Sequence, residues 1–319
     1  MLANLNNLLR QIAKATSCFD ADVYLVGGAV RDLMIGQEPN DLDLLLSDSL
    51  VEVVESVASE FSAECKIFPE YRTGSIALPV GPTVSAGMKR IDFSSFRSEV
   101  YSSPAALPQV SEGTLETDLA RRDFTVNALA VQLTSILDLE SKVALDRERL
   151  SELLIDQHGG RTDLDNKIIK VLHDQSFIDD PTRLFRAARY KTLLAASYDA
   201  GTAELIKDVI ASDLIGQLEG YRIKSELQRI CASRNSSVCL KELYSLGMMQ
   251  SLGFLELSED TFADLSAISP DDHNAFVKSM KLLLQNPSIA SREALLKRLA
   301  IRGQLKQAIL SNSLVDGAL

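Results

Sequence analysis

The chain has 319 residues, 46% of them hydrophobic, so it is long enough to bury two or three separate cores. Its net charge of −11 argues against a nucleic-acid-binding protein that is basic throughout, because phosphates are neutralised by an excess of Lys and Arg. No stretch reaches the ~18 uncharged apolar residues of a membrane span and residues 1–17 lack the order of a signal peptide, which predicts a cytoplasmic protein without membrane association.

The negative charge is concentrated in the first part of the chain. Residues 1–140 hold 10 basic and 20 acidic side chains, whereas the remainder holds 23 basic and 24 acidic ones. A domain that binds metal ions would carry such an acid excess, and the near-neutral remainder can still present a basic helix face. No C-x-x-C pair occurs among Cys18, Cys65, Cys231 and Cys239, so neither a zinc site nor a disulfide framework is indicated.

Helical and strand patterns alternate in the first 145 residues. Helical spacing of apolar residues predicts a helix over 2–16, and VYLV at 23–26 predicts a short buried strand. Gly27 and Gly28 open a turn into a helix that Gly36 can end as a C-cap. A strand over 41–46, a helix over 50–61 and strands at 74–79 and 89–93 follow, which together predict a mixed α/β domain.

Strand patterns end at about residue 146. Apolar residues then recur at three and four, most clearly over 181–195, 202–210, 222–232 and 291–310, so the second half is predicted to be all helix. The segment YSSPAALPQVSEG at 101–113 is rich in turn residues and predicts a long loop. The predicted fold class is α+β, with a mixed sheet and helices first and only helices afterwards.

Two carboxylates share one face of the strand at 41–46. Side chains two apart on a strand project to the same side, so Asp41 and Asp43 lie side by side and repel unless a cation sits between them. Mg²⁺ is the natural cation, since it prefers carboxylate oxygens and keeps waters for substrate phosphates. Asp92, on another predicted strand, is a third acid, and three carboxylates can hold two ions for an in-line phosphoryl transfer.

Each of these signals is weak when it is taken alone. A D-x-D pattern on an exposed edge is more often a solvated strand face, and a glycine pair after a strand is common in plain turns. The combination is more specific: strand, Gly27-Gly28, helix with Arg31-Asp32, and then D-x-D. The glycine turn would offer backbone N–H donors to a triphosphate, and the usual ATPase and dinucleotide-binding motifs are absent from the sequence.

The segment LVGGAVRDLMIGQEPNDLDLLL resembles the opening motif of the class II tRNA nucleotidyltransferase and bacterial poly(A) polymerase family. Four further blocks follow in the family's order: RIDFSSFRSEVY, LETDLARRDFTVNALA, DQHGGRTDL and SFIDDPTRLFRAARY. The resemblance implies a polymerase-β-like head at 1–145, a helical neck at 146–215 and a helical body at 216–319. It implies that Asp41 and Asp43 are the metal ligands, whereas Asp92 matches the family only by position.

The block RRDFTVNALA is assigned by the resemblance to ribose recognition. Asp123 and Asn127 can accept from a 2′-hydroxyl, and Arg122 is expected to face phosphate, as is the glycine turn with Arg31. The alternative from the residues alone is a salt-bridged structural corner.

Three arginines follow one another at a spacing of three in DDPTRLFRAARY. Arg183, Arg186 and Arg189 keep near one helix face, where they would repel unless they met an anion. The alternative is a capped helix with a solvated basic stripe. The family's E-D-x-x-R pattern occurs here as DDPTR, with Asp179 replacing the leading Glu.

Asp180 and Arg183 are the predicted base-reading pair. Cytosine and adenine each place an amino donor beside a ring-nitrogen acceptor, which a carboxylate and a guanidinium complement. Uracil and guanine present the reverse order, so they would leave buried charged groups unpaired. Arg186 and Arg189 would then face the triphosphate.

The last predicted helix, SREALLKRLAIRGQLKQAIL, is expected to be capped by Ser291. It carries basic residues at 292, 297, 298, 302 and 306, which form either a solvated face or a contact with the tRNA backbone. Family members are commonly longer, so the body is expected to be short.

The predicted activity is template-independent addition of C and A to the 3′ end of tRNA, from CTP and ATP, with Mg²⁺ and without a stable protein partner. Relatives that add only A, only CC or a poly(A) tail share these motifs and remain alternatives. A catalytically idle tRNA-binding protein is the non-enzyme alternative. A metal phosphohydrolase is a third, for which His173-Asp174 is the one candidate dipeptide.

Overall fold

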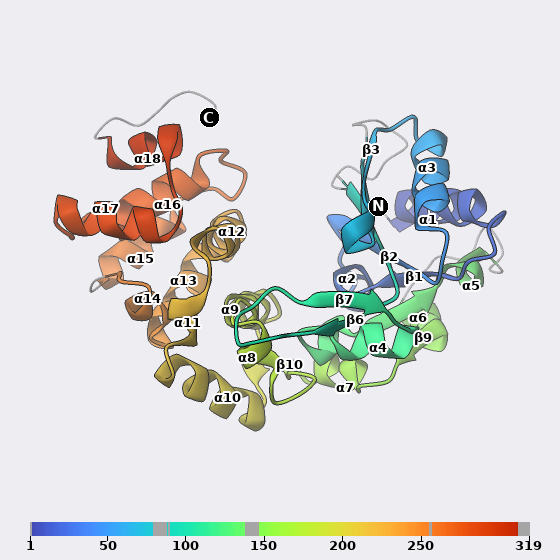
Figure 1. The fold of residues 1–319 in the computed structure, drawn as a ribbon, viewed down its shortest axis with the longest axis horizontal. Coiled ribbons are helices and arrows are strands. Elements are labelled where there is room, and N and C mark those ends of the chain that lie inside the picture. The colour runs from blue at the N-terminus through green and yellow to red at the C-terminus, as the bar shows by residue number, and fades with distance from the viewer. Residues whose placement is uncertain (1, 79–87, 89, 138–146, 255–256, 312–319) are drawn as a thin grey trace. The chain divides into compact units, whose positions relative to one another are not determined.

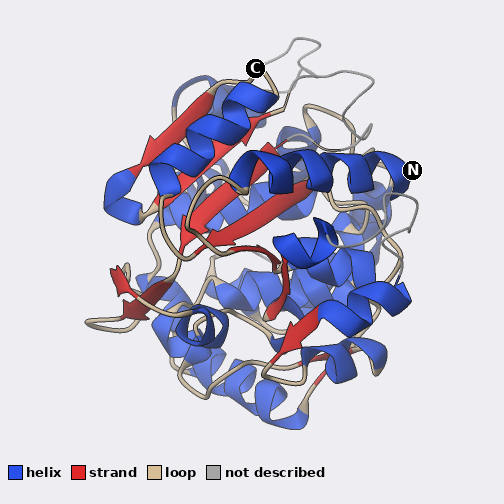
Figure 2. Ribbon diagram, turned by 90° about the vertical axis from the view of Figure 1, so that its right-hand side faces the viewer, coloured by secondary structure: helices blue, strands red, loops and turns tan. Residues whose placement is uncertain are grey.

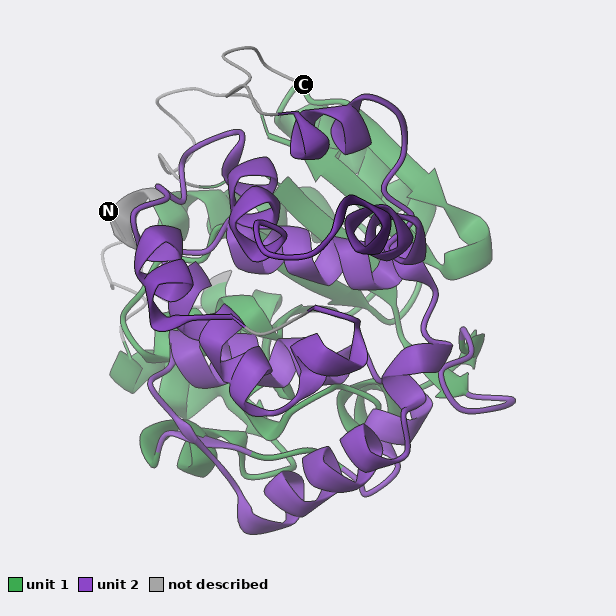
Figure 3. Cartoon of the chain, turned by 90° about the vertical axis from the view of Figure 1, so that its left-hand side faces the viewer, with its two compact units in different colours: residues 1–100, 108–166, 170–172 green, residues 101–107, 167–169, 173–319 purple. Residues whose placement is uncertain are grey.

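The computed structural model describes the chain except residues 1, 79–87, 89, 138–146, 255–256 and 312–319 (Figure 1). The chain forms two compact units, which are green and purple in Figure 3. Unit 1 contains residues 1–100, 108–166 and 170–172, and unit 2 contains residues 101–107, 167–169 and 173–319. The chain therefore passes between the two units several times.

A seven-stranded mixed sheet forms the centre of unit 1 (Figure 2, red). The strands lie in the order β3–β4–β5–β2–β1–β8–β9, and neighbours are antiparallel except for the parallel pair β2 and β5. Their bounds are β1 Val23–Val26, β2 Asp41–Leu46, β3 Cys65–Phe68, β4 Thr73–Ala77, β5 Arg90–Ser95, β8 Leu129–Gln132 and β9 Leu154–Asp156. The sheet confirms the predicted α/β head, and β1 and β2 have the predicted bounds.

Helices cover this sheet because their apolar residues recur at helical spacing. In α1, Leu5, Leu8, Leu9 and Ile12 are at most 2% exposed, and α1 packs against α3. Each fully buried Leu or Ile side chain contributes about 1.5–3 kcal/mol of hydrophobic free energy. The helices of unit 1 are α1 Leu2–Thr16, α2 Gly28–Met34, α3 Leu50–Glu60, α4 Leu115–Ala120, α5 Leu133–Leu137, α6 Arg147–Leu153 and α7 Gly160–Asp165, with the short 3₁₀ helices η1 Pro69–Tyr71 and η2 Thr125–Asn127.

The predicted loop at 101–113 is wrong in its last part. β7 (Gln109–Glu112) pairs in antiparallel fashion with β6 (Arg97–Val100), and the Ser98 and Ser111 hydroxyls lie 2.8 Å apart across the pair. β7 is polar and mostly exposed, so it shows no hydrophobic alternation and is held by cross-strand pairs rather than by a buried face.

Unit 2 is mostly helical, as predicted. Its short strands β10 (Ile168–Ile169) and β11 (Ser197–Tyr198) pair in parallel. Its helices are α8 Ser176–Asp179, α9 Arg183–Leu193, α10 Ala200–Ala211, α11 Leu214–Gln217, α12 Gly220–Cys231, α13 Ser236–Ser245, α14 Met248–Ser251, α15 Glu259–Ser266, α16 Ala275–Leu283, α17 Ile289–Arg298 and α18 Gly303–Leu310. Helices α9, α12, α13 and α16 pack on one another and form much of the core.

Strands do not end at residue 146, so the prediction of an all-helical second half needs correction. β9 extends the main sheet beside β8, and the β10–β11 pair lies further along the chain. These strands have two or three residues, too few to produce a period-two pattern. Residues 147–166 belong to unit 1, and the predicted end of the head at 145 stays a prediction. The functional division into neck (146–215) and body (216–319) remains a proposal.

The single helix predicted over 291–310 is two helices. The chain breaks between α17 and α18, where Ala300 and Gly303 have positive φ. The cap is Ser288 rather than Ser291, because the Ser288 hydroxyl accepts from the Ser291 N–H at 3.2 Å.

Three of the basic residues that form either a solvated face or a tRNA contact have structural partners in unit 2. Arg292 donates to the carbonyls of Pro287 and Gln285, at 2.9 and 2.6 Å. Arg298 donates from Nη1 to Leu218 O at 2.8 Å and from Nη2 to the carbonyls of Ile215 and Gly216. It therefore satisfies the last carbonyls of α11. Lys306 pairs with Glu293 at 3.1 Å. For these three residues the structural interpretation is favoured over a nucleic-acid contact.

The four cysteines are free, as the sequence predicted. Burial raises the pKa of the Cys231 thiol to about 11 and that of Cys239 to about 12, so both stay protonated and unreactive near neutral pH. Among the described residues, no helix is long and apolar enough to cross a membrane.

Candidate active site

The turn after β1 brings the glycines close to charged side chains of unit 1. Gly27 has φ +67°, and a Cβ at this position would lie 2.8 Å from Arg122 Nη1 and 3.6 Å from Asp43 Oδ2. The backbone angle therefore favours glycine here, and a Cβ would in addition displace the Arg122 guanidinium. The Gly27 N–H donates to Leu129 O at 3.0 Å, so it is used within the sheet rather than being available to a triphosphate.

Asp41 and Asp43 stand on the more exposed face of β2. Leu42 and Leu44, which alternate with them, are at most 1% exposed and face the core. Asp41 is exposed and Asp43 is half-buried. The two predicted metal ligands therefore share a face, and Asp43 lies next to the double-glycine turn.

Asp92 is opposite Asp43 in the parallel pairing of β5 with β2. Burial raises the pKa of the Asp92 carboxyl above its ordinary value of 3.8, Arg90 lowers it, and the charges of Asp43 and Asp41 raise it. The Asp92 carboxylate pairs with Arg90 at 2.7 Å.

The predicted cluster of three carboxylates is not formed. Among the described residues, no group of three or more His, Cys, Asp or Glu side chains is arranged to hold a metal ion. The Asp92 carboxylate contacts Arg90 instead, although burial outweighs this pairing and keeps its pKa raised. The remaining pair, Asp41 and Asp43, has the oxygen donors that a hard divalent cation prefers, and its like charges favour a bound cation.

The predicted ribose-reading residues are buried and bonded to each other. Asp123 and Asn127 are 5% and 4% exposed, and the Asn127 amide donates to Asp123 Oδ1 at 2.9 Å. Arg31 Nη1 donates to Asn127 Oδ1 at 2.6 Å, and its other nitrogens donate to Asp32. Asp32, Arg31, Asn127 and Asp123 therefore form one hydrogen-bonded chain that links α2 to η2. This is the structural corner considered as the alternative, and it leaves ribose contact by these residues a prediction.

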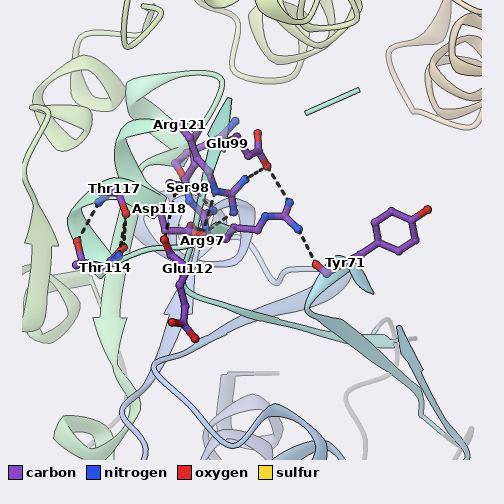
Figure 4. Close-up of polar contacts among 11 residues, drawn as sticks. Tyr71, Arg97, Ser98, Glu99, Glu112, Thr114, Thr117, Asp118 and Arg121 are labelled. Carbon is purple, nitrogen blue, oxygen red and sulfur yellow. Dashed lines mark hydrogen bonds and ion pairs between the residues drawn. The ribbon is translucent and has the colours of Figure 1, made fainter. Parts of the chain in front are cut away.

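An ion-pair network joins Arg97, Glu99, Arg121 and Asp118 (Figure 4), and Arg122 is bound to it through Asp118. Asp118, on α4, is completely buried and accepts from Arg122 Nη2 at 3.0 Å through Oδ1 and from Arg121 Nη2 at 2.6 Å through Oδ2. Glu99, on β6, pairs with Arg121 at 2.7 Å and with Arg97 at 3.2 Å. Asp118 and Glu99 were not singled out from the sequence. The one available signal was the spacing of Asp118, three and four residues before Arg121 and Arg122.

In unit 2, the predicted base-reading carboxylate of Asp180 has protein partners. Its Oδ1 accepts from Thr182 N at 3.0 Å, from Thr182 Oγ1 at 2.5 Å and from Arg222 Nη2 at 2.8 Å. Arg222, on α12, also donates to Ala105 O at 2.9 Å. Sequence reasoning missed Arg222, because a partner 42 residues away along the chain leaves no local pattern.

The three arginines of α9 do not form the solvated basic stripe considered as the alternative, and their contact with a nucleotide remains a prediction. Arg183 is 5% exposed and donates to Ser176 Oγ at 2.7 Å. Arg186 and Arg189 are half-buried around Tyr190, with guanidinium carbons 5.5 and 4.7 Å from the ring centroid. Both donate to the Tyr190 hydroxyl, at 3.2 and 3.5 Å. Their like charges are thus held near one aromatic side chain that the sequence did not mark as functional.

The chain resembles known proteins over most of its length. Residues 23–170 match the family model of the poly(A) polymerase head domain. An A-adding tRNA nucleotidyltransferase of Geobacter sulfurreducens is 34% identical over 243 residues, which are 76% of this chain but 25% of that protein. A CC-adding tRNA nucleotidyltransferase of Deinococcus radiodurans is 30% identical over 297 residues, which are 93% of this chain and 71% of that protein.

Solved structures share the fold. A CCA-adding enzyme in its apo form II superposes with a TM-score of 0.73 at 26% identity, over 96% of this chain and 70% of that one. A complex of a CCA-adding enzyme with ATP has a TM-score of 0.71 at 24% identity. The chain spans only about a quarter of the length of the Geobacter relative, so most of that protein has no counterpart here.

Proposed function

Because this chain belongs to the tRNA nucleotidyltransferase family, we propose that it adds C and A nucleotides to the 3′ end of tRNA, from CTP and ATP. The observation that supports this most directly is the position of Asp43 and Arg122 at the Gly27 turn. A metal-binding carboxylate beside a phosphate-binding guanidinium is the arrangement that nucleotidyl transfer requires.

Asp41 and Asp43 would hold Mg²⁺, which would neutralise charge on the triphosphate and orient it. The tRNA 3′-hydroxyl oxygen bonds to the α-phosphorus, the bond to the bridging oxygen breaks, and pyrophosphate leaves. We assign acceptance of the hydroxyl proton to Asp92, whose raised pKa suits a proton acceptor. Arg122 and Gly28 bind phosphate, and Asp123 with Asn127 contacts the ribose.

Base selection is assigned to Asp180 and Arg183, with Arg186 and Arg189 on the triphosphate. The carboxylate accepts from the amino group of cytosine or adenine, and the guanidinium donates to the ring nitrogen. Arg222 and Thr182 hold one oxygen of Asp180, which fixes the direction of the other. UTP and GTP would leave these groups unpaired, at a cost of about 1–3 kcal/mol for each.

Addition assays with defined tRNA ends test this function. The wild-type protein is incubated with Mg²⁺, each nucleoside triphosphate and tRNAs that end before CCA or after CC. We expect C, C and A on the first tRNA, A on the second, and no addition from UTP or GTP. Equal incorporation of UTP or GTP would contradict base selection by Asp180 and Arg183. Binding of tRNA without any transfer would favour the idle tRNA-binding protein.

Addition of A alone is the second candidate function. The Geobacter relative, 34% identical to this chain, is named for that activity. In the same assay, A added to the tRNA that ends in CC, with no C added to the shorter tRNA, would identify this activity. C added without A would identify a CC-adding enzyme, and a long A tail would identify a poly(A) polymerase.

A further inference from the structure

We infer that Asp118 is a positioning residue that aims Arg122 at the nucleotide phosphates beside the Gly27 turn. The inference rests on the proposed function, since it takes Arg122 as a phosphate-binding residue. Asp118 touches no reacting atom in this scheme and acts through the guanidinium that it binds.

The Asp118 carboxylate is built to hold two guanidiniums at once. Its side chain is 0% exposed, Oδ2 accepts from Arg121 at 2.6 and 3.0 Å, and Oδ1 accepts from Arg122 at 3.0 Å. A buried carboxylate that loses its ionic partners is strongly destabilising, because its charge is then left without compensation. The carboxylate therefore keeps both arginines in place, and Arg121 completes the charge balance through Glu99.

Arg122 depends on Asp118 for its orientation. Among the described residues, Arg122 makes one short hydrogen bond, from Nη2 to Asp118 Oδ1 at 3.0 Å. Its other contact, from Nη1 to Asn127 O, is 3.5 Å long. Its Nε is buried and has no hydrogen-bond partner within the described part of the chain. The edge of the guanidinium that carries Nη1 lies against the Gly27 turn, near Asp43 Oδ2. Arg122 thus retains donors on the side where the proposed triphosphate binds, while Asp118 fixes its other side.

Positioning and simple structural support predict different kinetics. Phosphate is common to all nucleotides, so misdirecting Arg122 raises KM for CTP and ATP by the same factor and leaves base selection unchanged. A residue that only supports the fold lowers the fraction of active protein, which reduces the apparent kcat without changing KM.

The test compares Asp118→Asn with Glu99→Gln, which removes the second buried carboxylate bound to Arg121. Binding of inorganic tripolyphosphate is measured by calorimetry, together with KM and kcat for CTP and ATP. We expect Asp118→Asn to weaken tripolyphosphate binding and to raise both KM values roughly tenfold, with kcat within about twofold of wild type. Glu99→Gln is expected to leave tripolyphosphate binding near the wild-type value, even where both variants lose similar thermal stability.

Arg122→Met provides a second route to the answer. It is expected to weaken tripolyphosphate binding as Asp118→Asn does. The double variant is expected to bind tripolyphosphate as well as Arg122→Met alone, because the two residues act through one contact. Full tripolyphosphate binding by Arg122→Met would overturn the inference even if Asp118→Asn did not fold. Additive losses in the double variant, or equal losses in Asp118→Asn and Glu99→Gln, would also overturn it. Failure of the wild-type protein to add any nucleotide would instead count against the proposed function.

Discussion

The two units hold their proposed functional groups in different ways. In unit 1, Asp41 is exposed and Asp43 stands beside a glycine turn, on the face of β2 that does not enter the core. In unit 2, Asp180 is bonded to Thr182 and Arg222, Arg183 is bonded to Ser176, and Tyr190 holds two further arginines. Two acids thus share one strand face at the proposed site of unit 1, whereas in unit 2 the Asp180 carboxylate and the Arg183 guanidinium each have a hydrogen-bond partner within the unit.

This difference agrees with the different tasks proposed for the units. Carboxylates that repel one another favour a divalent cation between them. Selection between bases needs groups that hold one direction, which requires fixed partners. In unit 1, the variants that remove a charge should therefore have the largest effects. In unit 2, the variants that remove a hydrogen-bond partner should have the largest effects.

Asp43→Ala is expected to have the largest effect. Loss of a carboxylate that anchors the metal removes charge stabilisation from the transition state, so addition of C and A should fall by about a thousandfold or more. Asp48→Ala is the matched control, since Asp48 is an exposed acid just beyond β2. Thermal denaturation should show both variants folded, and a Asp43→Ala protein that adds nucleotides at the wild-type rate would refute the proposed metal site.

Arg222→Met tests the compensated charge of unit 2. Without Arg222, Asp180 loses its charge-assisted hydrogen bond, and selection of ATP and CTP over GTP and UTP should fall about tenfold. Arg229→Met is the control, because Arg229 lies on the same helix with a side chain 56% exposed and pairs with Glu226. Selection ratios measured with all four nucleotides decide the matter, and an unchanged ratio would show that Arg222 serves only the fold.

The sequence predicted what depends on neighbouring residues. The bounds of β1 and β2, the shared face of Asp41 and Asp43 and the glycine turn all follow from period-two spacing and from the conformational freedom of Gly27. Resemblance to a family added the roles of these residues, which local spacing alone leaves open.

What depends on distant partners could not be predicted. Arg222 meets Asp180 across 42 residues, and the Asp92 carboxylate turns to Arg90 instead of completing a three-acid cluster. β9 has only three residues, too few to show a period-two pattern. Its pairing with the neighbouring strand β8 defines it as a strand. The break before α18 depends on backbone angles at Ala300 and Gly303 that apolar spacing does not encode.

Tyr190→Phe addresses how unit 2 holds Arg186 and Arg189. The variant keeps the ring under both guanidiniums but removes the hydroxyl that accepts from them. The donors are charged, but the hydrogen bonds are long, so their loss should cost about 0.5–1.5 kcal/mol and KM for CTP and ATP should rise about three- to fivefold with base selection unchanged. Tyr221→Phe is the control, since Tyr221 is 49% exposed. A change in selection rather than in KM would mean that Tyr190 acts on Arg183 instead of on the phosphate-binding pair.

The smallest expected effect is the pH dependence of stability at His173. Burial lowers the pKa of His173 below its ordinary value of 6.5, and Arg183 lowers it further, while Asp179 and Asp174 oppose the shift. The unfolded chain therefore binds the proton more readily, so the stability contributed by neutral His173 is complete above pH 6.5 and is lost as the pH falls below it. Melting temperatures of the wild type and His173→Gln, measured from pH 8 to pH 5, should show the wild type losing more stability in acid. Parallel curves of melting temperature against pH would mean that protonated His173 is tolerated beside Arg183. The positive charge near the start of α9 would then be less restricted than the hydrogen bonds of Arg183 and Asp180 indicate.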